Sequence, residues 1–118
     1  MPHLFIDYSD NLPLDEAALM LQLNTAVCAH PTVAAEHDLK TRVTRQSSYR
    51  IGRHPEQRAY VHAELRLLAG RSDAVKKALS DAIATVLRER TPHPPGMLVQ
   101  LSVEIADMDR GSYHKGEL

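Results

Sequence analysis

Aromatic residues and cysteine are scarce in this 118-residue chain: Trp is absent and the aromatic share is only 4%. Leu, Val, Ile and Ala must therefore fill the core. The single cysteine, Cys28, excludes an intramolecular disulfide and favours a reducing compartment. The first residues lack the basic region and apolar stretch of a signal peptide, so we expect a cytoplasmic protein. No apolar run reaches the roughly 20 residues of a membrane-spanning helix, so we expect no membrane partner.

A strong charge of either sign is also missing. Lys and Arg total 14 and Asp and Glu total 15, which gives a net charge of −1. Proteins that bind nucleic acid usually carry a basic excess, because phosphate contacts dominate their affinity, so we expect no nucleic-acid partner. The seven His residues show no paired metal-ligand spacing, and no glycine-rich phosphate loop appears. We therefore expect neither a metal nor a cofactor.

What the chain does contain is two kinds of hydrophobic periodicity. Apolar and polar residues alternate over residues 3–8, 39–49, 61–67 and 97–105, which predicts four strands. Apolar residues recur at helical spacing over residues 13–30 and again after Ser72, a good helix N-cap, up to residue 90. Residues 50–56 read as a turn-rich connection.

The order of these elements is β-α-β followed by β-α-β. We expect one domain over residues 1–118, with repeats at about 2–50 and 59–106 and a polar tail at 107–118. A strand–helix–strand crossover usually makes a parallel, right-handed pair. The pattern therefore predicts an α+β fold: a four-stranded mixed sheet with two helices on one face.

The other face of this sheet is predicted to be mostly polar. It carries His3, Phe5, Lys40, Arg42, His62, Glu64, Arg66, Gln100, Ser102 and Glu104. A sheet face washed by solvent explains this pattern, and so does an oligomer interface with paired polar groups. The pattern alone slightly favours the solvated face.

Pro2 is the most informative candidate for chemistry. Proline after the initiator methionine normally permits removal of that methionine, which leaves a secondary amine at the first atom of the chain. Many proteins begin Met-Pro without catalytic consequence, but here Pro2 opens a strand that looks buried. Burial and nearby cations lower the pKa of an amine. Such an amine becomes an effective general base near neutral pH.

The predicted topology brings cations to the same place. If the first two strands are parallel and the second unit runs antiparallel to the first, then Pro2, Lys40, Arg42 and Arg71 converge at one sheet edge. Arg71 also precedes a helix start, where backbone N–H groups favour anions. Taken singly, each cation is explained equally well as a surface residue.

Three blocks of sequence resemble the 5-carboxymethyl-2-hydroxymuconate delta-isomerase family of the tautomerase superfamily. They are the opening Pro2-His3 followed by Ser9-Asp10-Asn11, the strand segment Leu39-Lys40-Thr41-Arg42-Val43, and residues 60–72, which end in Ala69-Gly70-Arg71-Ser72. The closing strand at 101–105 is also similar. The resemblance covers nearly the whole chain.

This resemblance implies a cofactor-free isomerase that assembles as a homotrimer around its sheets, which would turn the polar face into an interface. It also implies that Pro2 is the general base and that Arg71 binds substrate carboxylates and polarises a carbonyl. A second family arginine falls on Lys40, with Arg42 two residues on. Lysine keeps the charge but loses the bidentate fork of arginine, so the exact substrate stays open.

Three functions remain in competition. The leading one is an isomerase that shifts a double bond in an unsaturated hydroxy- or keto-di/tricarboxylate of aromatic catabolism. The second is a non-catalytic α+β module that binds a small molecule. The third is a hydratase or dehalogenase of unsaturated acids, in which an extra carboxylate positions water, with Asp7 and Glu64 as loose candidates.

Overall fold

The secondary structure comes from a computed structural model that describes residues 1–54 and 56–118. The strands are β1 (His3–Ser9), β2 (Lys40–Gln46), β3 (Arg58–Leu68) and β4 (Leu98–Met108), and the helices are α1 (Glu16–Cys28), the short 3-10 helix η1 (Glu36–Asp38) and α2 (Asp73–Arg90). Pro55, which belongs to the predicted turn-rich connection, lies outside the described residues. No helix in the described part of the chain is long and apolar enough to cross a membrane.

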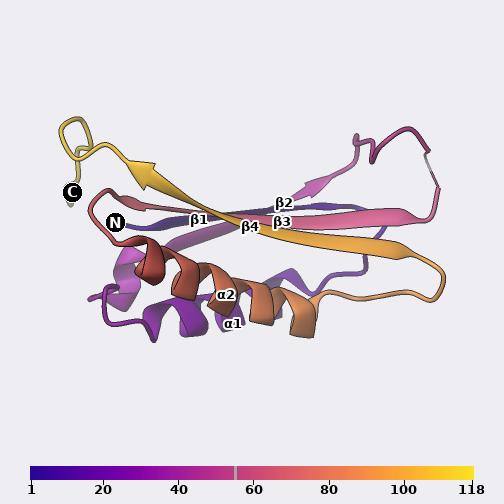
Figure 1. Cartoon of the computed structure of the whole chain (residues 1–118), viewed down its shortest axis with the longest axis horizontal. Coiled ribbons are helices and arrows are strands. Elements are labelled where there is room, and N and C mark those ends of the chain that lie inside the picture. The colour runs from indigo at the N-terminus through magenta and orange to yellow at the C-terminus, as the bar shows by residue number, and fades with distance from the viewer. Residues whose placement is uncertain (55) are drawn as a thin grey trace.

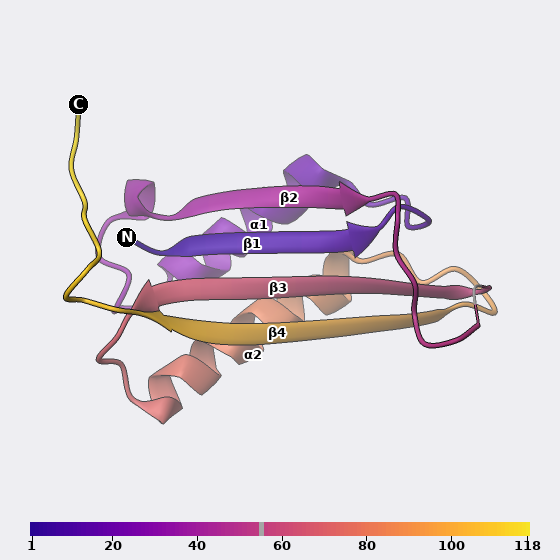
Figure 2. The same ribbon diagram turned by 90° about the horizontal axis from the view of Figure 1, so that it is seen from above.

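The four strands form one mixed sheet in the order β2-β1-β3-β4 (Figure 2). β1 is parallel to β2, β3 is parallel to β4, and the two central strands β1 and β3 are antiparallel. Both helices cover the same face of the sheet (Figure 1). The predicted fold class, an α+β fold with a four-stranded mixed sheet and two helices on one face, is confirmed.

The core lies between the helices and the central strands, because alternate residues of each strand point to the helical face. Its buried members from the strands and helices are Leu4, Ile6, Tyr8, Ala59, Val61, Ala63, Leu65, Leu67, Leu19, Leu23, Val27, Leu79, Ile83, Val86 and Leu87. In the edge strand β4, Val99, Leu101, Val103 and Ile105 are only half-buried. Because aromatic residues are scarce, aliphatic side chains make up most of this core.

Side-chain caps set where both helices begin. The Oγ of Ser72 accepts a hydrogen bond from the Val75 N–H at 3.2 Å, which confirms the predicted cap of α2. The start predicted for the first helix at Pro13 is wrong by three residues. Asp15 is extended and accepts from the Ala18 N–H at 3.1 Å, so the chain becomes helical only at Glu16.

The Ser9-Asp10-Asn11 block joins two strands at the carboxyl end of β1. Ser9 is fully buried, and its Oγ accepts from the Tyr60 N–H at 3.0 Å. The Asn11 amide donates to the Arg58 carbonyl at 2.8 Å. This block therefore holds the end of β1 against the start of β3, a strand's length away from Pro2.

The strand register brings distant segments together at the opposite edge. His3 pairs with Lys40, and Leu68 pairs with Met108, so β1 and β2 begin where β3 and β4 end. The carboxyl end of α1, the amino end of α2 and both chain termini lie at this edge as well (Figure 1). The candidate site lies there.

Candidate active site

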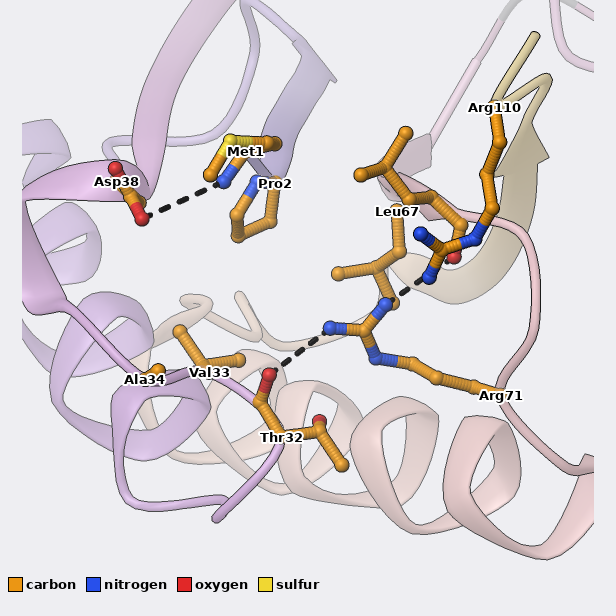
Figure 3. A pocket seen from close by; sticks show the side chains of 10 residues that line it. Met1, Pro2, Thr32, Val33, Ala34, Asp38, Leu67, Arg71 and Arg110 are labelled. Carbon is orange, nitrogen blue, oxygen red and sulfur yellow. Dashed lines mark hydrogen bonds and ion pairs between the residues drawn. The ribbon is translucent and has the colours of Figure 1, made fainter.

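A cavity of about 150 Å³ opens between the start of β1, the connection from α1 to β2, and the end of β3. The residues lining it are Met1, Pro2, Thr32, Val33, Ala34, Asp38, Leu67, Leu68, Arg71 and Arg110 (Figure 3). The structure thus brings Pro2 and Arg71 into one cavity, as the topology argument expected.

Pro2 is buried and held by the sheet, since its carbonyl accepts from the Lys40 N–H at 3.2 Å. Met1 covers it, with the Met1 α-amine 3.8 Å from Oδ2 of Asp38. Burial lowers the pKa of this amine from its ordinary value. The carboxylate of Asp38 opposes that shift, whereas Lys40, Lys115 and Arg71 add to it. An amine at this position therefore lies in an environment that favours its neutral form.

Arg71 links the two connections that frame the cavity. Its Nη2 donates to the Thr32 carbonyl at 2.9 Å, and its Nη1 donates to the Leu68 carbonyl at 3.2 Å. Its Nε is buried and has no hydrogen-bond partner among the described residues. Arg71 follows Gly70, whose φ of +127° is a conformation that other residues rarely adopt. This turn directs the Arg71 side chain back towards Thr32 and the cavity (Figure 3).

Two lining residues were missed by sequence reasoning. The Asp38 carboxylate accepts from Nζ of Lys115 at 3.2 Å, and this hydrogen bond holds the pKa of Asp38 below its usual range. Nε of Arg110 donates to the Ala69 carbonyl. Asp38 could have been found by its position just before β2, and Arg110 by extending the pairing of β3 with β4 two residues past its end.

Lys40 and Arg42 do not line this cavity. Within one chain the predicted convergence fails for Arg42, because alternate residues of a strand point to opposite faces. Nη2 of Arg42 is 3.0 Å from Nδ1 of His3, and its guanidinium lies 4.3 Å from the centre of the Phe5 ring, on the open face. Lys40 reaches only the rim, where its Nζ donates to the Asp38 carbonyl at 2.8 Å.

The carboxylates considered for water chemistry also lie on the open face. Asp7 accepts from the Tyr60 hydroxyl at 2.8 Å, and Glu64 pairs with Arg66 at 3.5 Å. Neither lines the cavity with Pro2. On the same face, His62 contacts Ser102 and Glu104 from β4, at 2.7 and 3.1 Å. Several side chains of the polar face are therefore paired with one another within the chain.

The structure offers little for metal or thiol chemistry. Within residues 1–54 and 56–118, no group of three His, Cys, Asp or Glu side chains could hold a metal ion. Cys28 is half-buried, and burial raises the pKa of its thiol. A thiol of that kind is a poor nucleophile.

The fold, with its two β-α-β units and a cavity at Pro2, defines the class: a small α+β protein of the tautomerase superfamily. Similar solved structures include a 5-carboxymethyl-2-hydroxymuconate isomerase from Deinococcus radiodurans R1, which is 30% identical over 99% of this chain and 90% of its own, with a TM-score of 0.85. A 5-carboxymethyl-2-hydroxymuconate delta-isomerase (20% identity, 99% and 88% coverage, TM-score 0.71) and a fused 4-OT described as a symmetric trimer (20%, 92% and 87%, 0.73) share the fold.

The sequence matches the family described as 5-carboxymethyl-2-hydroxymuconate isomerase over residues 2–118, and the chain belongs to that family. No curated protein matches it. The resemblance inferred from the three sequence blocks is confirmed, and the protein is an isomerase.

Proposed function

We propose that this protein, once Met1 is removed, shifts a double bond in an unsaturated hydroxy- or keto-di/tricarboxylate such as 5-carboxymethyl-2-hydroxymuconate. The observation that carries the proposal is the burial of Pro2 in a cavity that it shares with the guanidinium of Arg71. The family match supports the same reaction class and its place in aromatic catabolism.

The proposed mechanism needs no cofactor. The Pro2 amine takes a proton from the hydroxyl of a dienol or from a carbon beside a carbonyl, which leaves a dienolate. Arg71 stabilises the negative oxygen and an adjacent carboxylate by charge and hydrogen bonds. The protonated Pro2 then returns the proton to another carbon of the conjugated system. The atoms balance, because the net change is the position of one proton and one double bond.

Removal of Met1 is part of this proposal for two reasons. While Met1 remains, the Pro2 nitrogen is an amide without basicity. Met1 also lines the cavity. The cavity volume of about 150 Å³ is smaller than the volume of roughly 300–1,000 Å³ that is usual for small-molecule sites. Losing the residue frees the amine and enlarges the site in one step.

Assembly completes the proposed site. We propose a homotrimer in the cytoplasm, supported by the fused 4-OT trimer of the same fold and by the satisfied polar pairs on the open sheet face. Arg42 points to that face, so its role as a substrate-binding residue requires a cavity on a neighbouring subunit, whereas Lys40 stands at the rim of its own chain's cavity. The molar mass in solution, from light scattering, tests the trimer.

The deciding experiment combines intact mass with kinetics. We expect a mature mass without methionine, and a fall in kcat/KM of about 10²- to 10⁴-fold in Pro2→Ala, the range that general bases contribute. Pro13→Ala, at an exposed proline, is the matched control and should retain full activity. Full activity of Pro2→Ala, or a mature enzyme that retains Met1 and turns over, refutes the assignment of Pro2 as base.

A second candidate reaction, hydration or dehalogenation of an unsaturated acid, is favoured only by the Asp38 carboxylate inside the cavity. Product analysis separates it from isomerisation, since water is added only in the former. A protein that binds such acids without converting them would be the non-catalytic module.

A further inference from the structure

The carboxyl-terminal segment 109–118, which we call the tail, is anchored across the cavity edge at three points. Nε of Arg110 donates to the Ala69 carbonyl. The Tyr113 hydroxyl lies 3.0 Å from Nε2 of His3, and Nζ of Lys115 lies 3.2 Å from Oδ1 of Asp38. These anchors belong to β1, to the β3–α2 turn and to η1, so the tail is held by the elements that frame the cavity.

The first anchor fixes the Arg110 guanidinium on the cavity wall. Leu68 pairs with Met108, which places Arg110 beside Gly70 two residues later. A Cβ built on Gly70 would lie 3.5 Å from Nη2 of Arg110, so the guanidinium packs directly on this glycine. From there its terminal nitrogens face the side of the cavity that holds Arg71 (Figure 3).

The charge in this part of the cavity is not balanced by the protein. Within the described residues, the hydrogen-bond partners of both Arg71 and Arg110 are backbone carbonyl oxygens. Among the described residues that line the cavity, Asp38 alone is acidic, and it pairs with Lys115 and the Met1 amine. Two neighbouring guanidiniums without carboxylate partners attract an anion, and the fork of each matches a carboxylate.

We propose that Arg110 binds a second carboxylate of the substrate and thereby selects di- and tricarboxylates over monocarboxylates. The inference rests on the proposed function, which places the substrate between Pro2 and Arg71. Lys40, in contrast, does not line the cavity, and its Nζ donates to the Asp38 carbonyl at the rim. In this chain the tail supplies a second guanidinium to the same cavity.

Equilibrium binding to the mature protein tests the proposal without requiring turnover. The probes are trans,trans-muconate, which has two carboxylates, and sorbate, which has a methyl group in place of one of them. Titration calorimetry compares wild type with Arg110→Ala and with Arg110→Gln, which keeps a donor for the Ala69 carbonyl. Arg88→Ala removes an exposed arginine from the last turn of α2, far from the cavity, and is the matched charge control.

We expect wild type and Arg88→Ala to prefer muconate to sorbate. Both Arg110 variants should lose about tenfold to hundredfold in muconate affinity, the effect of one charged hydrogen-bonded contact, with sorbate affinity nearly unchanged. The proposal is overturned if the wild type binds muconate and sorbate equally well, or if the Arg110 variants still prefer muconate. If the Arg110 variants lose the preference for muconate but the wild type isomerises no substrate, the role of Arg110 in binding is supported and only the proposed function is refuted.

Discussion

Replacing Arg71 by alanine should destabilise the protein as well as impair its activity. The guanidinium joins the Thr32 carbonyl, before η1, to the Leu68 carbonyl, at the end of β3, through hydrogen bonds of 2.9 and 3.2 Å. Hydrogen bonds that involve a charged group contribute about 1.5–3 kcal/mol each. Because Arg71 is half-exposed and water can replace part of the interaction, we expect Arg71→Ala to cost about 2–4 kcal/mol in total.

This loss is measurable by thermal unfolding. A change of 1 kcal/mol shifts the midpoint of a domain of this size by about 4 °C, so Arg71→Ala should unfold about 8–16 °C below wild type. Arg71→Lys keeps the charge but not the fork, and its single ammonium cannot reach both carbonyls. It should lose roughly half as much stability and still raise KM for carboxylated substrates.

A midpoint for Arg71→Ala within about 2 °C of wild type would refute the reasoning, because it would mean that the two hydrogen bonds contribute no net stability. A second test uses kinetics at a temperature where all variants are folded. If KM and kcat of both variants equal those of wild type there, Arg71 does not touch the substrate and its role is purely structural.

Three further outcomes follow from other contacts. Ser9→Ala leaves the half-buried Tyr60 N–H without its 3.0 Å partner, so the urea midpoint should fall by an amount equivalent to about 1–3 kcal/mol; a neutral change would show that another acceptor takes over. Burial, followed by the hydrogen bond to Glu16, raises the pKa of Tyr8 from 10.0 to about 12. The neutral phenol is therefore favoured in the folded state, and stability present below pH 10 is lost as the pH rises through 12. Tyr8→Phe should show a smaller loss of unfolding free energy over that interval, and an equal loss in wild type and variant would contradict it. Burial lowers the pKa of the Met1 amine and the Asp38 carboxylate raises it. Pro2 lines the same cavity as Asp38, so in the mature protein Asp38→Asn should move the acid limb of kcat/KM to lower pH, and an unmoved or raised limb would count against Pro2 as the titrating base.

The fold was predictable from the sequence because its signals are local. Alternation in β1 and β3 marks strands with one buried face, and Ser72 marks a helix start through a contact three residues away. The start of α1 was misplaced, because a proline suits the first helical turn and the side chain of Asp15 decided the boundary instead.

The site was predictable only as far as backbone topology determines it. Strand direction alone brings Pro2 and Arg71 to one edge. Strand direction does not determine which face of the sheet a side chain occupies. Arg42 is at an alternate position that faces the open side of the sheet, where it lies over Phe5. Arg110 sits in a polar segment without periodicity, so only the exact end of the β3–β4 pairing reveals its neighbours.

The position of Arg110 separates substrate preference from the stability of the core, two properties that substitutions usually change together. Met108 is the last buried residue of the chain, and everything after it is at least half-exposed. Substitutions in the tail can therefore alter what the cavity accepts without disturbing the aliphatic layer between sheet and helices. Among relatives that keep the same sheet and helices, substrate preference should diverge fastest after β4. A variant library confined to residues 109–115 is the economical place to redirect the enzyme.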